Sequence, residues 1–291
     1  MLVTALLSGL VLGGTYALVA MGLTLQYGIA RIMNLAYGET IIAAAFLAYV
    51  LFTGLGINPV IGLLAAAPLG FGLGYLIYGL MMQPLVRRAR SRENLEIDSI
   101  LATFGLLFVI QGVLLVMFGS NYTSYSYLNV GVNVLGTNIA ANRLLAFVMA
   151  IVLGGGLYLA LTRTLWGTAL RAVAVSPSSS PLVGIDVDRA ARMAFAIGGA
   201  LAASGGVVIS MYQTFTATAG VVFTMKALIV VVIMGGVGNV LGALASGLIL
   251  GLVETFVATY VDPGLTLAAT YLIFLAILLW RPAGLFGRSA R

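Results

Sequence analysis

The residues that could carry chemistry are few, and they fall in three stretches of an otherwise apolar chain. The first stretch, Gly22–Glu39, lies between two apolar segments, and its polar members are Gln26, Asn34, Tyr37 and Glu39. A carboxylate flanked by apolar segments is costly unless it is paired or hydrated, and Arg31 is the expected partner of Glu39. Two interpretations remain open. The stretch is a solvated turn with an exposed ion pair, or a broken helix whose end lines a path for a solute.

The second stretch, Met234–Gly242, carries four glycines and an asparagine within apolar sequence: Gly235, Gly236, Gly238, Asn239 and Gly242. Such a run unwinds a helix or permits a tight re-entrant turn. A phosphate-binding loop is disfavoured because no Lys, Ser or Thr follows at the required spacing. Glu254 follows within the next apolar run. Three roles remain open for it: a structural hydrogen bond, contact with a substrate amine, or proton transfer.

The third stretch is the longest polar loop, Arg163–Arg192. Its pattern predicts a short amphipathic helix, a Ser/Pro turn and a second short helix. Several of its residues are nevertheless apolar: Leu165, Trp166, Leu170, Val173 and Leu182. These residues indicate either a helix lying on the membrane surface or a docking element for a cytoplasmic partner.

Composition determines the class of protein that carries these stretches. Hydrophobic residues make up 62% of the 291 positions and charged residues 8%, which is too few charges for a water-facing surface. Soluble enzymes and nucleic-acid-binding modules are thereby excluded. Cysteine and histidine are absent, so disulfides, Cys/His metal sites and His- or Cys-dependent triads are excluded as well. The single lysine, Lys226, does not stand in a Walker A motif, so no ATP site, cofactor or metal is expected in this chain.

Apolar segments of near-spanning length predict an all-α polytopic membrane protein with about eight to nine transmembrane helices. They cover residues 2–26, 37–54, 59–82, 99–119, 143–162, 193–213, 222–236, 239–259 and 265–280. The segment 222–236 is short for a full span, so we expect at least one broken or re-entrant helix. We interpret the whole chain, 1–291, as one transmembrane domain that contains the loop 163–192. Four small-xxx-small pairs, beginning at Gly9, Gly70, Gly238 and Gly247, predict close packing of helix backbones.

The distribution of basic residues predicts the orientation of the chain. When the spans alternate from Arg87 and Arg88, twelve of the fourteen basic residues fall on one side, which the positive-inside rule assigns to the cytoplasm. Arg143 and Lys226 then fall outside. The same alternation places the C-terminus in the cytoplasm.

Five motifs in order resemble the LivH-type permease subunits of ABC importers for branched-chain amino acids, and the resemblance covers almost the whole chain. They are Gly22–Glu39, Ala102–Leu106, the loop with Arg171, Ala172, Pro177, Gly184, Ile185, Val187 and Arg189, Gly235–Ala243, and Gly251-Leu252 with Glu254. The sequence departs from the family pattern at Tyr37, where the family has His, at Ser178–Pro181, and at Leu241. The first departure bears on substrate choice, and the second bears on which ATPase docks.

The resemblance implies residue roles that spacing alone does not give. The ATPase-coupling loop would use Trp166, Arg171, Ala172, Pro177, Gly184, Ile185, Asp186, Asp188 and Arg189. The translocation path would be bordered by Gln26, Asn34, Tyr37, Glu39, Gly235, Gly236, Gly238, Asn239 and Glu254.

The resemblance also implies partners. These are a second permease subunit (LivM-like or a second copy of this chain), two cytoplasmic ATPases that hold ATP and magnesium, and an extracytoplasmic binding protein. All of them would act at a bacterial or archaeal cytoplasmic membrane. Two alternatives remain open: a permease of the same family for urea, short amides or another small solute, and a stand-alone carrier or channel.

Overall fold

The computed structural model describes residues 2–89, 91–134, 136–231 and 239–280. Within these ranges, eight helices are long and apolar enough to cross a membrane, which confirms the predicted all-α polytopic fold. The spanning elements are α1 (Leu2–Ala30), α2 (Tyr37–Leu55), α3 (Pro59–Ile77) continued by η1 (Tyr78–Met82) and α4 (Gln83–Arg88), α5 (Arg92–Phe118), α6 (Ala141–Arg163), α8 (Val187–Ser210), α10 (Val240–Tyr260) and α11 (Thr266–Trp280). The shorter elements are α7 (Leu165–Val175), α9 (Gly220–Leu228), the turns η2 (Ser180–Val183) and η4 (Pro263–Leu265), and the antiparallel hairpin of β1 (Gly131–Val134) with β2 (Thr137–Ala140).

Several helices begin at capping residues that are visible in the sequence. The side chain of Asn58 accepts from the backbone N–H of Val60 at the start of α3, and Pro59 occupies the first turn. Asp186 accepts from the N–H of Arg189 at the start of α8 in the same way. Local sequence therefore fixes where these helices start, while tertiary packing determines which of their faces are buried.

The core is formed by α1 and α8, which are the most buried of the spans. Helix α1 packs against α10, α8 and α6, and α3 packs along α8. The α1–α10 crossing needs glycine, because a Cβ on Gly251 would lie 2.1 Å from the backbone nitrogen of Gly13. A Cβ on Gly74 would likewise lie 2.4 Å from the carbonyl oxygen of Phe195 at the α3–α8 crossing. Close helix approach at these small-xxx-small pairs is confirmed.

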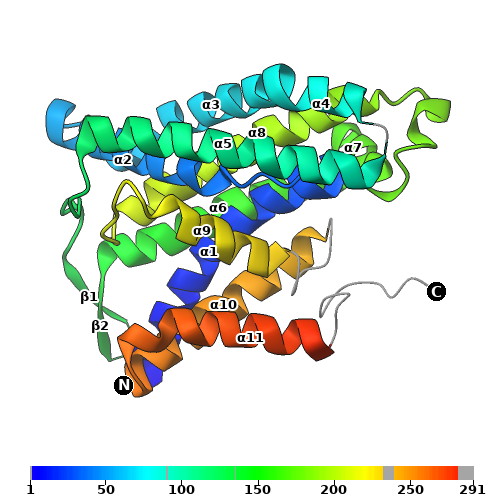
Figure 1. Ribbon diagram of the computed structural model, residues 1–291. Coiled ribbons are helices and arrows are strands. Elements are labelled where there is room, and N and C mark those ends of the chain that lie inside the picture. The colour runs from blue at the N-terminus through cyan, green and yellow to red at the C-terminus, as the bar shows by residue number, and fades with distance from the viewer. Residues whose placement is uncertain (1, 90, 135, 232–238, 281–291) are drawn as a thin grey trace.

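The bundle has two chemically different ends (Figure 1). The β1–β2 hairpin lies at one end, together with the start of α6 and its Arg143. The opposite end carries α4 and α7, and basic residues collect on the elements there: Arg31, Arg87, Arg88, Arg163, Arg171, Arg189 and Arg192. We call these the hairpin end and the arginine end. The alternation of spans predicts that these arginines lie on one side, and they do gather at one end of the bundle.

Helix α9 corrects the prediction for Lys226. Within the described residues, the apolar helix of this region covers Gly220–Val231, and the rest of the predicted segment 222–236 lies outside them. Lys226 does not lie in an outer loop. Its side chain is 13% exposed and lies 2.9 Å from Glu254 inside the bundle. Counting alternating full spans placed it outside, because such counting cannot anticipate a charged side chain that is paired inside the bundle.

Candidate translocation path and coupling segment

The chain breaks after α1 and returns into the bundle before α2 begins. Arg31 adopts a left-handed conformation with φ 56°, which ends the helix. Asn34 is buried, and its Nδ2 donates to Oε1 of Gln26 at 3.1 Å. Gln26 in turn donates to the carbonyl oxygen of Phe195 on α8, at 3.1 Å. The predicted residues Gln26 and Asn34 therefore form one buried network that holds the break against α1 and α8.

Glu39 is fully buried in the first turn of α2. Both of its carboxylate oxygens lack a hydrogen-bond partner among the described residues. The expected pair with Arg31 is wrong, because the Arg31 guanidinium donates instead to the carbonyl oxygen of Ala174 on α7, at 3.2 Å. The left-handed turn directs the chain so that Arg31 stays at the arginine end while Glu39 packs against Gly220 of α9.

Tyr37 occupies the interior beside α1. Its hydroxyl donates to the carbonyl oxygen of Val19 at 2.7 Å, and its side chain is 1% exposed. The hydroxyl lies where a side chain on Gly22 would otherwise be, because a Cβ there would be 2.2 Å from it. Where the family pattern has histidine, this chain thus uses tyrosine to bind the α1 backbone.

A second buried cluster joins four helices, with Glu254 of α10 at its centre. Lys226 of α9 donates to Oε2 of Glu254 at 2.9 Å and to the hydroxyl oxygen of Tyr16 at 2.7 Å. Tyr16 of α1 donates to the same Oε2 at 2.7 Å, and Thr270 of α11 donates to Oε1 at 2.8 Å. Both carboxylate oxygens are satisfied, and this is the one ion pair within the described ranges. Sequence reasoning identified Glu254 but missed its three partners.

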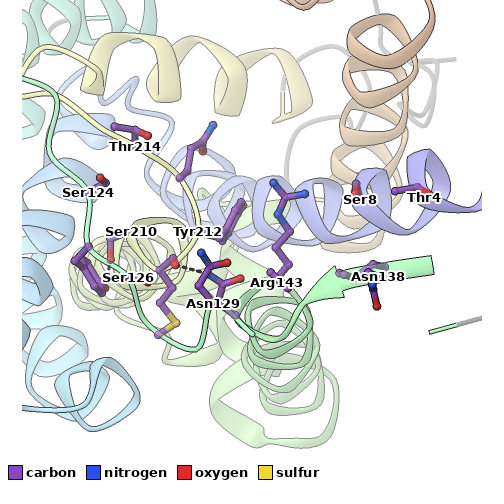
Figure 2. A pocket seen from close by; sticks show the side chains of 16 residues that line it. Thr4, Ser8, Ser124, Ser126, Asn129, Asn138, Arg143, Ser210, Tyr212 and Thr214 are labelled. Atoms are coloured by element: carbon purple, nitrogen blue, oxygen red, sulfur yellow. Dashed lines mark hydrogen bonds between the residues drawn. The ribbon is translucent and has the colours of Figure 1, made fainter. Parts of the chain in front are cut away.

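The hairpin end holds a polar cavity of about 480 Å³, which we call the vestibule (Figure 2). Its wall carries hydroxyls and amides, with Arg143 as the charged member: Thr4, Ser8, Ser124, Ser126, Asn129, Asn138, Asn142, Ser210, Tyr212 and Gln213 are among the residues that line it. Burial raises the pKa of Tyr212 to about 12 and also raises the pKa of Tyr125, so both phenols stay neutral. The vestibule suits a small polar solute.

A second cavity, of about 330 Å³, lies between the vestibule and the Lys226–Glu254 pair. We call it the pair pocket. It shares four residues with the vestibule, namely Ser8, Arg143, Tyr212 and Gln213, and is also lined by Tyr16, Lys226 and Glu254. The shared residues make the two cavities neighbours along one route from the hairpin end into the bundle.

The predicted path residues do not meet at one point. Glu254 contacts Tyr16, whereas Asn34 contacts Gln26, ten residues later on α1 and about 15 Å further along the helix. Asn239 is exposed and caps α10, accepting from the N–H of Gly242. Gly235, Gly236 and Gly238 lie outside the described residues. The arrangement gives two buried polar levels along α1 rather than one site.

At the arginine end, the loop 163–192 contains the predicted short helix and Ser/Pro turn, but its last residues, from Val187 on, belong to the spanning helix α8. Helix α7 is followed by a Ser/Pro turn and by η2, and Ser180 closes the turn by donating to the carbonyl oxygen of Ser176 at 2.8 Å. The apolar residues divide into two sets. Leu170 and Val173 are buried, whereas Leu165, Val175, Leu182 and Val183 are each at least 73% exposed. The exposed set is the surface available for a partner.

The remaining predicted coupling residues support this shape. Gly184 takes φ +79° and Asp186 caps α8, while Trp166, Ile185 and Arg189 line a cavity of about 420 Å³ between α7 and the start of α8. Ala172 and Pro177 are half-buried, and Arg171 is exposed.

Asp188 connects the loop to the end of α3. It accepts from the hydroxyl of Tyr78 at 3.0 Å and from the amide of Gln83. Arg192 contacts the same Gln83 and also Tyr75. Sequence reasoning missed Tyr78 and Gln83, because neither residue belongs to a motif and both meet Asp188 across more than 100 positions of chain. A movement of the loop would thus reach η1 directly, just as it would reach the break after α1 through Arg31 and Ala174.

Comparison with known proteins identifies the family. The family described as "Branched-chain amino acid transport system / permease component" matches residues 5–280. The permease protein BraD of Pseudomonas aeruginosa, of a high-affinity branched-chain amino acid transport system, is 30% identical over 97% of this chain and 95% of its own length. LivH of Escherichia coli K12 is 28% identical over 97% and 94%, and a probable LivH of Methanocaldococcus jannaschii is 29% identical over 93% and 88%. No solved structure shows a significant match. This chain therefore belongs to the family of permease components of branched-chain amino acid transport systems.

Proposed function

We propose that this protein is the membrane-spanning permease of an ATP-driven importer that carries leucine, isoleucine and valine. The match of the family over residues 5–280 is the observation that carries the proposal. The geometry supports it, because a polar vestibule lies at one end and exposed apolar side chains of α7 and η2 lie at the other.

The coupling segment supports energy input from another subunit. The exposed apolar side chains of α7 and η2 would bind a cytoplasmic ATPase that holds ATP and magnesium. Closure of that ATPase would move α7, and the bond from Arg31 to Ala174 would carry the movement to the break before α2. The contacts of Asp188 with Tyr78 and Gln83 would carry it to α3.

The proposal includes a specific assembly. Two permease chains, this one with a related subunit or with a second copy, would stand in a bacterial or archaeal cytoplasmic membrane with the C-terminus inside. A binding protein would deliver substrate to the vestibule from the outer side. The exposed apolar surface of α5 and α11, of which few residues are buried, supports contact with lipid or with the second permease chain.

Reconstitution in vesicles tests the function. The chain is reconstituted with its ATPases, second permease and binding protein, and uptake of labelled leucine is measured with and without ATP. We expect uptake to require ATP hydrolysis and to be competed by isoleucine and valine. The matched control carries an ATPase variant that binds but does not hydrolyse ATP, and it should abolish uptake. Competition by urea or short amides instead, or uptake by the chain alone without ATP, would overturn the proposal.

A further inference from the structure

The ion pair of Lys226 and Glu254 calls for an explanation beyond stability. Buried ion pairs contribute little net stability, because the cost of removing two charges from water offsets their attraction. Ionisable residues within a membrane segment therefore mark functional sites by default. This pair also closes one end of a pocket, since both side chains line the pair pocket and Lys226 retains 13% exposure.

The pair pocket offers partners for both ends of an amino acid. Lys226 and Arg143 are cations that suit a carboxylate, and both line the pocket. Glu254 suits an ammonium group, and so does Oε1 of Gln213, a buried acceptor that has no partner among the described residues. The positive and negative groups belong to different helices, Lys226 to α9 and Glu254 to α10, and lie 2.9 Å apart. A zwitterion therefore matches the pocket better than an ion of either sign.

The rest of the pocket suits an aliphatic side chain. Val11, Leu12 and Ala258 add apolar surface to its wall. Its volume of about 330 Å³ is at the small end of ligand pockets, which suits a single amino acid rather than a peptide.

We propose that Lys226 and Glu254 bind the carboxylate and the ammonium group, respectively, of a zwitterionic amino acid in the pair pocket. This inference rests on the proposed function and specifies the part of the chain that holds the substrate. On binding, the Lys226 ammonium moves from Glu254 to the substrate carboxylate, and Glu254 accepts from the substrate ammonium. Glu254 keeps its bonds from Tyr16 and Thr270, which hold it in place during the exchange. Lys226 and Glu254 each have a partner of opposite charge before and after the exchange.

A double variant separates this role from a structural one. Lys226→Gln and Glu254→Gln each strand one charge in the interior, so each alone is expected to lower both thermal stability and uptake. The double variant removes both charges and lets two amides bond, so its melting temperature should return to the wild-type value. Uptake of labelled leucine by the complete importer should remain at least about 30-fold lower, the loss expected when charged partners of a ligand are removed. Recovery of uptake together with stability would overturn the proposal.

A thiol-protection assay locates the ligand directly, because the chain has no native cysteine. Ser8 lines both the vestibule and the pair pocket, so Ser8→Cys is modified by a water-soluble methanethiosulfonate. We expect leucine to slow this modification, and neither 4-methylpentanoate, which lacks the amine, nor 3-methylbutylamine, which lacks the carboxylate, to do so. The matched control Ser120→Cys, on the exposed loop after α5, should react at one rate with all three compounds.

The outcomes of the two assays separate the inference from the function on which it rests. Absence of protection by leucine, or equal protection by the three compounds, overturns the zwitterion site even where the complete importer takes up leucine. Zwitterion-specific protection that disappears in the Lys226→Gln/Glu254→Gln background supports the site. It does so even where ATP-driven uptake of leucine fails, a result that would contradict the proposed function alone.

Discussion

The contact between α2 and α9 allows a sharp test of how the interior is held together. Gly38 of α2 donates its N–H to the hydroxyl oxygen of Thr224, and a Cβ at Gly38 would lie 1.9 Å from the carbonyl oxygen of Gly220. Ordinary contact begins near 3.4 Å, so Gly38→Ala requires α2 and α9 to separate by about 1.5 Å. Forced overpacking of this kind costs about 1–3 kcal/mol. The separation would also break the bond to Thr224 and move Lys226, which is carried on the same short helix.

Helix α2 also provides a matched control for Gly38→Ala. Gly54 is also in α2, and a Cβ there would meet nothing within 4 Å. Because alanine has the higher helix propensity, Gly54→Ala should be neutral or stabilising by up to about 1 kcal/mol. Thermal unfolding of both purified variants in detergent, followed by leucine uptake in vesicles, measures the difference. We expect Gly38→Ala to melt several degrees below wild type and to lose uptake. Equal melting of Gly38→Ala and Gly54→Ala would refute the close approach of α2 and α9.

Three further predictions concern the coupling segment and the break after α1. Gly184→Ala places a side chain at φ +79°, which costs about 1–2 kcal/mol. The variant should still insert into the membrane, as immunoblots would show, but hydrolyse ATP without uptake. Uptake per ATP hydrolysed at the wild-type ratio would contradict this prediction. Leu182→Ser should reduce the amount of ATPase that co-purifies with the permease, whereas Val116→Ser, equally exposed but on α5, should not. An equal loss of ATPase in both variants would contradict the proposed docking of the ATPase at Leu182. Asn34→Cys, buried in this structure, should react with water-soluble thiol reagents only during ATP turnover, and protection in every nucleotide state would exclude Asn34 from the path.

Much of the fold could be predicted because membrane spans follow local rules. Apolar length gave the eight spans that the structure describes, and turn residues such as Asn58 with Pro59 marked their starts. The short helix and turn in the loop 163–192 were predictable for the same reason, since Asp186 and the Ser/Pro turn act on their own neighbours. These signals depend on residues a few positions apart, which a single sequence displays directly.

The contacts of the candidate sites could not be predicted from such rules. Glu254 was identifiable as a carboxylate within a span, but the approach of Tyr16, 238 positions away, depends on how α1 and α10 cross. The Glu39 prediction failed for a related reason. Proximity in sequence suggested Arg31 as its partner, yet the left-handed residue at position 31 separates the two, and the Arg31 side chain donates to Ala174 of α7 instead.

Counting charges predicted the side of the membrane for the arginines but did not predict the buried position of Lys226. Counting treats each apolar segment as a full span, so a lone lysine after α8 is placed at the outer surface. Helix α9 instead carries this lysine inside the bundle, where its Nζ lies 2.9 Å from Oε2 of Glu254. Lys226, a basic residue that does not follow the positive-inside rule, is then better explained by its pairing inside the bundle than as a basic residue tolerated on the outer side. For this reason the exceptional lysine, rather than the arginines that obey the rule, is the residue on which the route of the substrate should be tested first.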